Sequence, residues 1–390
     1  MHKVFRRPAV TRDNQLDPSS VGNELVVEIA AGRLHLQLTR QDIPLHDALD
    51  FATRRNPKRP FLFVSKLLGR HMPTYPTVLR GVAGKLSRKL AAVPMDGPVL
   101  FVGMAETATA LGQAVFQLWI AAGNEGLYLD TTRRRTGCEV AFTFREAHSH
   151  AVEHFVHLPA AADDPSAIFR RARTMVIVDD ETTTGQTAVQ LLSEYSRFVG
   201  HNVKGCLAVI ANWLGSSSVG DDVRIVSLIE GRATFEGTSM PGSHQLPGPL
   251  VNGGVESCSL APRSSRHGLR APQKLKEEPR RSGQKILVVG VGEFLYLPLT
   301  FAEALENMGA EVWIQATTRS PIQEGGAIKH VREFAALTGE GYREYLYNVP
   351  PNHPYDRVVI CGETPFDIPP GHALRDITCL EQCLLETHKP

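Results

Sequence analysis

The sequence has almost no excess charge of either sign. Among its 390 residues, 42 lysines and arginines stand against 41 aspartates and glutamates, which gives a formal net charge of +1. A chain with so little net charge has no overall field that would attract nucleic acid or an anionic membrane. It also lacks any apolar run near the ~18 residues that span a bilayer. We therefore expect a globular protein with no nucleic-acid and no membrane partner.

Cysteine is scarce as well, and the six that occur are scattered. Only Cys379 and Cys383 are close together, at the i,i+4 spacing of a helix. So sparse a set argues against a disulfide framework and against a cysteine metal site. The N-terminus is basic but has no apolar stretch typical of a secretory signal. These absences predict reduced thiols in a cytoplasmic protein. The other four cysteines are Cys138, Cys206, Cys258 and Cys361.

Length and composition predict two domains. A chain of 390 residues, 42% of them hydrophobic, is longer than one ordinary core accommodates. Residues 237–283 are rich in Gly, Pro, Ser and Arg, and they cannot bury enough apolar surface to offset their ordering entropy. We therefore predict a first domain over 1–236, a largely disordered linker over 237–283 and a second domain over 284–390.

Strands alternate with helices in both predicted domains. Residues 24–39 alternate like a hairpin, residues 98–103 form an apolar strand, and residues 78–90 and 106–123 suit helices, the second with an acid in its first turn. Because such alternation is typical of a mostly parallel sheet flanked by helices, we expect an α/β fold in each domain.

The second domain looks like a worn copy of the first. In both, an apolar strand that ends in Gly is followed by a helix, a second strand and the triplet Thr-Thr-Arg, at 131–133 and again at 317–319. The alternative, that all strand–helix–strand units look alike, stays open. If the copy is real, Cys361 and Gly362 stand where the first domain carries two acids.

Those two acids, Asp179 and Asp180, end an apolar strand and precede three threonines, a glycine and a helix. In an open α/β sheet, ligands bind beyond the carboxyl ends of the strands. Helix N-terminal amides and hydroxyls favour a phosphate, and carboxylates suit ribose hydroxyls or Mg²⁺. The stretch therefore predicts a sugar-phosphate site, although it is not a Walker A loop. An ordinary capped turn would explain one threonine but not the paired acids.

This stretch resembles the phosphoribosyl-pyrophosphate (PRPP) signature of type I phosphoribosyltransferases, especially the orotate enzymes. The resemblance implies the type I phosphoribosyltransferase fold, PRPP as donor and Mg²⁺ as cofactor. It implies that Asp179 and Asp180 are catalytic, bind the ribose hydroxyls and hold the metal largely through PRPP and water. It assigns the 5′-phosphate to Thr182, Thr183, Thr184, Gly185, Gln186 and Thr187.

Two further segments fit that family. The pyrophosphate loop would comprise Ala105, Glu106, Thr107, Ala108 and Thr109, although an ordinary helix start explains Glu106 equally well. Arg133, Arg134 and Arg135 lie where the family has its mobile catalytic loop and would clamp pyrophosphate, unless they are a solvated basic loop. Glu146 and His148 are weak candidates for a base, and His148 with His150 could bind a metal or form a strand edge.

The whole chain resembles the bacterial phosphoribosyltransferase-like proteins of tellurite-resistance and stress gene clusters. Their C-terminal TRSP domain is named after its Thr-Arg-Ser-Pro motif, which here is 318–321. The resemblance implies a second Rossmann-like α/β domain and the synthesis or modification of a nucleoside-like metabolite. A homodimer and partners from the same gene cluster stay open. Candidate ligand residues of this domain are Glu293, Thr318, Arg319 and Ser320, although Glu293 also fits a helix N-terminus.

Two functions follow from different classes of protein. One is a transferase that uses PRPP and a base-like acceptor, and the other is a non-catalytic regulator that senses PRPP or a nucleotide. The arginine-bearing loop favours the transferase. RNA binding by the linker is a weaker hypothesis, because its arginines are sparse and lack interleaved aromatic residues.

Overall fold

The computed structural model describes residues 24–56, 58–134, 138–145, 153–159, 163–217, 219–237, 267–271, 275, 284–337 and 341–385. Several predicted residues lie outside this part of the chain, namely Arg135, Glu146, His148, His150, Cys258 and most of the predicted linker. Among the described residues, no helix is both long and apolar enough to cross a membrane.

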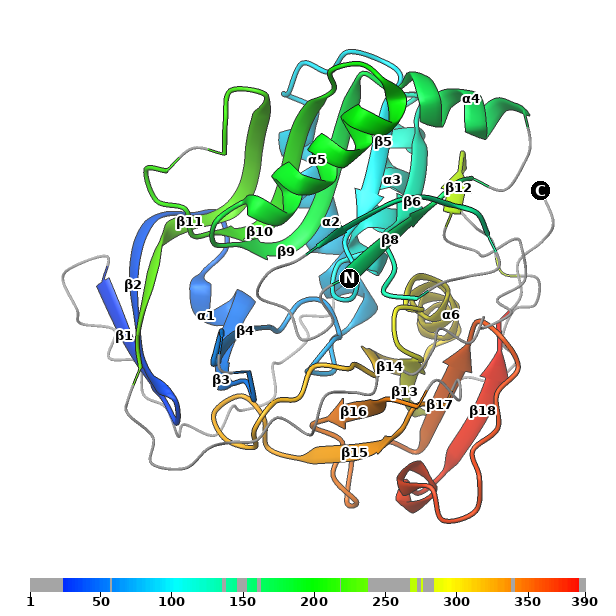
Figure 1. The fold of residues 1–390 in the computed structure, drawn as a ribbon. Coiled ribbons are helices and arrows are strands. Elements are labelled where there is room, and N and C mark those ends of the chain that lie inside the picture. Colours follow the sequence, from blue (N-terminus) through cyan, green and yellow to red (C-terminus); the bar gives the residue numbers. More distant parts are fainter. Residues whose placement is uncertain are drawn as a thin grey trace, which may run out of the picture.

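The larger sheet has eight strands in the order β1-β2-β11-β10-β9-β5-β6-β12 (Figure 1). The five strands from β11 to β6 are parallel, whereas β1, β2 and β12 pair antiparallel. This confirms the predicted hairpin and the mostly parallel sheet. The strands are β1 (Glu24–Ile29), β2 (Gly32–Gln41), β5 (Val99–Gly103), β6 (Leu127–Asp130), β9 (Thr174–Thr182), β10 (Lys204–Asn212), β11 (Val223–Gly237) and β12 (His267–Leu269).

Helices cover both faces of this sheet because its central strands are apolar on both sides. In β5, Val99 and Phe101 belong to the core that includes α2 (Pro76–Leu90) and α3 (Thr109–Ala121). The alternate residues Leu100 and Val102 belong to the core under α4 (Asp163–Arg171) and α5 (Gln186–Val199). Such two-sided burial produces the continuous apolar runs seen in the sequence.

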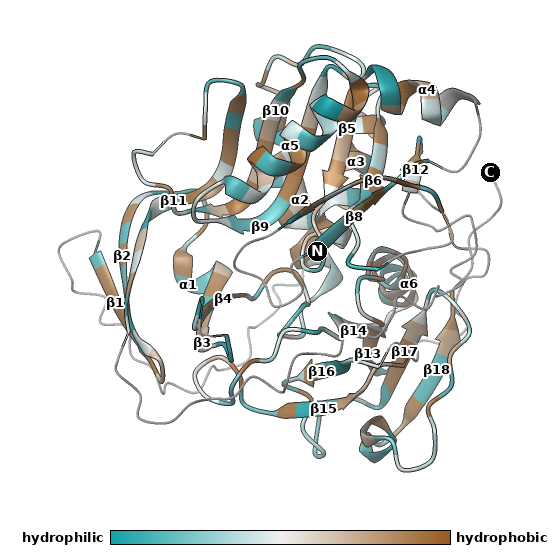
Figure 2. Cartoon of the chain, in the orientation of Figure 1, coloured by the Kyte–Doolittle hydropathy of each residue, from teal (hydrophilic) through white to brown (hydrophobic). Residues whose placement is uncertain are grey.

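The smaller sheet has four parallel strands in the order β14-β13-β17-β18. They are β13 (Lys285–Gly290), β14 (Glu311–Ala316), β17 (Arg357–Gly362) and β18 (Leu380–Leu384), and α6 (Tyr296–Asn307) packs on β13 and β14. Figure 2 shows β17 largely hydrophobic, as expected for a buried parallel strand. The remaining elements are α1 (Leu45–Ala48), the short 3-10 helix η1 (Ala373–Asp376) and the antiparallel pairs β3 (Leu49–Thr53) with β4 (Phe61–Ser65), β7 (Val140–Arg145) with β8 (Glu153–His157), and β15 (Val331–Ala335) with β16 (Arg343–Tyr347).

The two halves of the molecule share one core. Buried residues of α2, α3, α6 and β14 belong to a single hydrophobic cluster, and α6 lies between the two sheets (Figure 1). The segment before α2 also pairs with β14, since the Ala316 amide donates to the Gly69 carbonyl at 2.7 Å. Gly69 has φ +65°, and a Cβ there would lie 2.8 Å from the Ile314 carbonyl oxygen, so this close approach requires glycine.

The arrangement of strands recurs between the halves. The parallel order β9-β5-β6 in the larger sheet matches β17-β13-β14 in the smaller one. The loop after β6 bridges β8 through Thr132 and Phe155, and the loop after β14 bridges β16 through Thr318 and Tyr345. This recurrence supports the duplication hypothesis, which stays a prediction.

Three details differ from the sequence-based expectations. Helix α3 begins at Thr109, three residues after Glu106, because the segment that carries Glu106 turns toward the other half of the molecule. Strand β9 continues through the two acids to Thr182, because β10 pairs with it to Asn212. Within the predicted linker, β12 pairs with β6, so this piece is ordered.

We predict that Leu299→Ala will destabilise both halves together. Leu299 lies on α6, is fully buried and belongs to the shared core. Loss of its side chain should lower the free energy of unfolding by about 2–5 kcal/mol. In denaturant titrations followed by circular dichroism, the whole transition should move as one step. Val189→Ala on α5, where the side chain is 38% exposed, is the control and should shift little. A transition that splits in two, with only one part shifted, would contradict a shared core.

Candidate functional site

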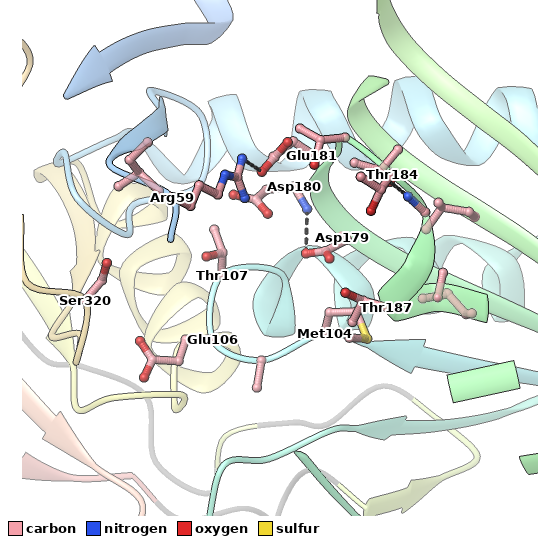
Figure 3. A pocket seen from close by; sticks show the side chains of 18 of the residues that line it. Arg59, Met104, Glu106, Thr107, Asp179, Asp180, Glu181, Thr184, Thr187 and Ser320 are labelled. Carbon is pink, nitrogen blue, oxygen red and sulfur yellow. Dashed lines mark hydrogen bonds and ion pairs between the residues drawn. The ribbon is translucent and has the colours of Figure 1, made fainter. Parts of the chain in front are cut away.

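A pocket lies at the carboxyl ends of β5, β9 and β10, where the acids and threonines meet three other segments (Figure 3). In a parallel sheet, the helices that follow the strands begin near this edge. Ligands are therefore expected to bind here. From the β9–α5 segment the lining includes Asp179, Asp180, Glu181, Thr182, Thr183, Thr184, Gly185 and Thr187. The other segments contribute Met104, Ala105, Glu106, Thr107 and Arg133; Arg54, Arg59, Leu62 and His71; and Thr318 and Ser320.

The threonine turn between β9 and α5 is built by its own hydroxyls. The Gly185 amide donates to Thr182 Oγ1 at 3.1 Å, and the Gln186 amide donates to Thr184 Oγ1 at 3.4 Å. Gly185 has φ +70°, and a Cβ there would lie 1.9 Å from Val219 Cγ1. Glycine is therefore required, and Thr187 and Ala188 of the first turn of α5 line the pocket. Gln186 itself is exposed and does not line the pocket.

The acids at the end of β9 differ in their surroundings. The Asp180 amide donates to Asp179 Oδ1 at 2.9 Å, and Glu181 forms a 2.5 Å ion pair with Arg59 (Figure 3). Burial, reinforced by the neighbouring Glu181 charge, raises the pKa of Asp180 to about 6. Asp180 thus changes charge close to neutral pH, where a metal or a ribose hydroxyl would compete with its proton.

The predicted pyrophosphate loop divides in two. Ala105, Glu106 and Thr107 line the pocket, whereas Ala108 and Thr109 are buried away from it. The Ala105–Glu106 peptide is cis, and the Ala105 amide donates to Thr131 Oγ1 at 3.0 Å. The loop is therefore attached to the Thr-Thr-Arg segment that follows β6.

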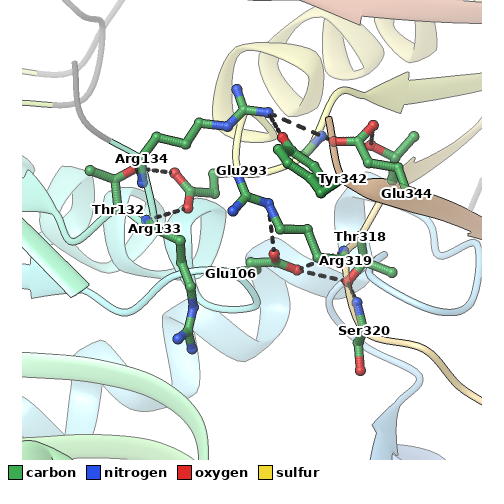
Figure 4. Close-up of polar contacts among 12 residues, drawn as sticks. Glu106, Thr132, Arg133, Arg134, Glu293, Thr318, Arg319, Ser320, Tyr342 and Glu344 are labelled. Carbon is green, nitrogen blue, oxygen red and sulfur yellow. Dashed lines mark hydrogen bonds and ion pairs between the residues drawn. The ribbon is translucent and has the colours of Figure 1, made fainter. Parts of the chain in front are cut away.

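The Glu106 carboxylate reaches into the other half of the molecule (Figure 4). It accepts from Thr318 Oγ1 at 2.7 Å and from the Arg319 amide at 3.3 Å. Burial alone would raise the pKa of Glu106, but attraction by Arg70 and Arg319 outweighs it and lowers the pKa below its ordinary value. Glu106 is therefore ionised, although only 11% of its side chain is exposed.

Glu293 makes the mirror-image contact. Its carboxylate, only 3% exposed, accepts from Thr132 Oγ1 at 2.6 Å and from the Arg133 amide at 2.8 Å (Figure 4). We call the two contacts the reciprocal clasp: Glu106 with 318–319, and Glu293 with 132–133. Beside it, the buried Arg70 guanidinium donates to the Thr317 carbonyl at 2.7 Å and to the Gly292 carbonyl at 2.5 Å.

The predicted arginines have different positions. Arg133 lines the pocket, and its side chain extends away from Glu293 (Figure 4). Arg134 faces the other half instead, where it donates to the Tyr342 hydroxyl and lies 3.7 Å from Glu344. Arg319 also avoids the pocket lining and lies over the Tyr342 ring, 3.8 Å from its centroid. Of these three arginines, only Arg133 reaches the pocket.

Nine lining residues were not predicted, namely Arg54, Arg59, Leu62, His71, Met104, Ile177, Glu181, Ala188 and Leu207. Four of them come from β3, β4 and the flanking loops, where an apolar run lies between basic clusters in the sequence. That pattern was a detectable signal, but it does not say toward which part of the fold the segment points. Glu181 is the third acid of the signature and lay in its spacer.

The carboxylates at this pocket suit Mg²⁺ only in a shared role. Among the described residues, no group of three or more His, Cys, Asp or Glu could hold a metal by itself. Protein-bound Mg²⁺ often takes one or two carboxylates and completes its shell with waters and substrate phosphates. Asp179 and Asp180 fit that pattern, in which a bound ligand supplies most of the oxygens.

Comparison with known families accounts for most of the described chain. A family model described as phosphoribosyl transferase matches residues 48–232, and a second, described as the TRSP domain C-terminal to it, matches residues 263–376. No curated protein matches the sequence.

Solved structures of adenine phosphoribosyltransferases are similar to part of the chain at low identity. The protein from Rhodothermus marinus is 15% identical, and the match covers 48% of this chain and 96% of that one with a TM-score of 0.33. The protein from Giardia lamblia, complexed with 9-deazaadenine, is 17% identical, with 49% and 98% covered and a TM-score of 0.34. The protein from Trypanosoma brucei, in complex with AMP, pyrophosphate and ribose-5-phosphate, is 11% identical, with 50% and 82% covered and a TM-score of 0.34.

Asp180 should make stability depend on pH. Its pKa is near 3.8 in the unfolded chain and about 6 in the folded one, so the folded state binds more protons between these values. The contribution of Asp180 to the free energy of unfolding is therefore present below about pH 4, and it is lost as the pH rises toward 6. Asp180→Asn should remove this slope in denaturant titrations between pH 4 and 7. Asp221→Asn, at an exposed aspartate outside the site, should retain the wild-type slope; an unchanged slope in Asp180→Asn would refute the assignment.

Glu293→Gln tests the reciprocal clasp. The amide keeps the shape of the side chain, but its NH₂ group faces one of the two donors, so one buried bond is lost. We expect the free energy of unfolding to fall by about 1–3 kcal/mol, measured in denaturant. Glu324→Gln, at an exposed glutamate of the same half, is the matched control. Equal stability of the two variants would show that the contact is dispensable.

Proposed function

We propose that this chain, which belongs to the phosphoribosyl transferase family through residues 48–232 and carries a TRSP domain after it, is a Mg²⁺-dependent enzyme that transfers the phosphoribosyl group of PRPP to a base-like acceptor. One observation carries the proposal. Paired acids at the end of a parallel strand and a threonine turn at a helix N-terminus line the same pocket. Each alone has ordinary explanations, but together they match the two ends of a ribose phosphate.

The donor would lie along the pocket in a fixed order. Its 5′-phosphate would contact the threonine turn, where amides, hydroxyls and the start of α5 favour an anion. Its ribose hydroxyls would face Asp179 and Asp180. Its pyrophosphate would then lie by the Ala105–Thr107 loop, with Arg133 beside it. In this order Gln186, Ala108 and Thr109, which do not line the pocket, would support the site without contacting the donor.

In the transfer, the C1–oxygen bond to pyrophosphate breaks and a bond from C1 to an acceptor nitrogen forms. Positive charge develops on the ribose, so an ionised Asp179 and Asp180 nearby would stabilise the transition state. Arg133 would offset negative charge on the departing pyrophosphate. When bound, Mg²⁺ would neutralise part of the pyrophosphate charge. A base two residues before Gly185 could remove the proton of the acceptor nitrogen, but Thr183 stands there and cannot act as a base. Another group must therefore accept this proton.

A binding-only role is the second candidate, and one observation favours it. Arg134, predicted as catalytic, is engaged with Tyr342 and Glu344 rather than with the pocket. A protein that senses PRPP or a nucleotide would need the threonine turn and the acids, but it would not need a second arginine. We also propose, from the family resemblance alone, a cytoplasmic protein that acts on a nucleoside-like metabolite in a stress or tellurite-resistance setting, alone, as a homodimer or with proteins of the same gene cluster.

The double variant Asp179→Asn with Asp180→Asn should abolish turnover. Without either charge, the developing cation on the ribose loses its nearest stabilising groups. The measurement is pyrophosphate release from PRPP and Mg²⁺ over a panel of purine and pyrimidine bases. The control is Asp221→Asn with Asp222→Asn, two adjacent and exposed aspartates outside the pocket.

Three results are distinguishable. Wild-type turnover that only the Asp179–Asp180 variant loses supports the transferase. Tight PRPP binding without pyrophosphate release for any base favours the sensing role. Normal turnover by the Asp179–Asp180 variant would remove the ribose assignment.

A further inference from the structure

The far end of the pocket, away from the threonine turn, is walled by two segments that the donor does not use. One is the chain from β3 to the loop after β4, which contributes Leu62 and His71, and the other is the TRSP motif, which contributes Ser320. In Figure 3, Ser320 and Thr184 lie on opposite sides of the pocket residues, with Asp180 between them. Tyr347 connects the two segments at this end, because its ring lies 6.0 Å from the His71 ring and its hydroxyl donates to the Ser320 carbonyl at 2.6 Å. The end opposite the phosphate site is therefore shared by both halves of the molecule.

His71 offers polar atoms that nothing described in the protein uses. The residue is 4% exposed and lines the pocket, yet neither ring nitrogen has a hydrogen-bond partner among the described residues. Burial and the neighbouring Arg70 charge lower the pKa of His71 to about 3, so the ring is neutral and carries one donor and one acceptor. The backbone is held in place, because Asn348 Nδ2 donates to the His71 carbonyl at 3.0 Å.

Ser320 repeats this pattern from the other half. Its amide donates to Thr318 Oγ1 at 3.1 Å and its carbonyl accepts from the Tyr347 hydroxyl at 2.6 Å. Its own hydroxyl, on a residue only 7% exposed, has no partner among the described residues. A buried hydroxyl without a partner costs free energy, and a ligand in the pocket would recover it.

We propose that His71 and Ser320 form the recognition site for the acceptor, so that the TRSP domain completes the substrate pocket of the transferase half. This inference rests on the proposed function. The matching ligand is a planar nitrogen heterocycle that presents both a hydrogen-bond donor and an acceptor. A neutral imidazole and a hydroxyl pair well with such an edge, and Arg54, which also lines the pocket, adds positive charge near His71. The Leu62 side chain supplies an apolar contact for the ring.

Titration calorimetry on the full chain with nucleoside 5′-monophosphates tests this inference. Ribose 5-phosphate probes the phosphate and ribose sites alone, and AMP, GMP, IMP, UMP and CMP add an uncharged base. OMP adds an anionic base. We expect at least one of these nucleotides to bind about tenfold or more tighter than ribose 5-phosphate, as for gained hydrogen bonds and apolar contact.

Two variants then show which residues cause this gain in affinity over ribose 5-phosphate. Ser320→Ala and His71→Phe, which keeps a ring without polar atoms, should each reduce it roughly three- to tenfold and leave ribose 5-phosphate binding unchanged. Ser193→Ala, on the exposed face of α5, is the control and should retain the gain. Loss of ribose 5-phosphate binding in either variant would point to a folding defect and count against a specific recognition role.

Two outcomes would overturn the inference while the proposed function stands. They are an unchanged affinity gain in both variants, and no nucleotide that binds tighter than ribose 5-phosphate. If the wild-type chain binds neither ribose 5-phosphate nor PRPP, the proposed function itself fails and the acceptor site fails with it. The ribose 5-phosphate titration separates these cases.

Discussion

Two buried carboxylates that cross between the halves of the molecule set the geometry on which the pocket depends. A carboxylate removed from water is stable only where donors surround it. Glu106 finds its donors in the loop after β14, and Glu293 finds them in the loop after β6. Each half therefore fixes a loop of the other, and neither loop has the same surroundings in an isolated half. The shared core of α2, α3 and α6 holds the two halves at the distance that this exchange requires.

The reciprocal clasp also gives the Thr-Arg-Ser-Pro motif a physical meaning. Thr318 donates to Glu106 and lines the pocket, so it connects the loop of one half to the wall of the other. Arg319 adds charge against Glu106 and stacks on Tyr342, which makes it a residue of the interface. Ser320 turns its hydroxyl to the pocket. Three consecutive residues thus serve the clasp, the interface and the ligand site, and substitutions among them should have different effects.

Much of the ligand edge could be predicted from the sequence because its signals are local. Acids, threonines and glycine between a strand and a helix occupy adjacent positions, and the sheet direction places them on one edge. The partners of Glu106 and Arg134 could not be predicted, because their contacts lie across 212 and 208 positions of sequence. The same limit explains why His71 was missed: its segment is an apolar run between basic residues in the sequence, and only the tertiary fold turns it toward the pocket.

The two similar strand arrangements differ at the end of the strand where a ligand would bind. In the first, β9 ends in acids that face an open pocket. In the second, β17 ends in a fully buried Cys361 and in Gly362, where a Cβ would lie 2.4 Å from the Phe366 ring. A sugar phosphate needs acids and open space, and this position has neither. Ligand-related effects of variants in the second half should therefore be felt in the pocket of the first half, through Thr318, Ser320 and the contacts of Glu293.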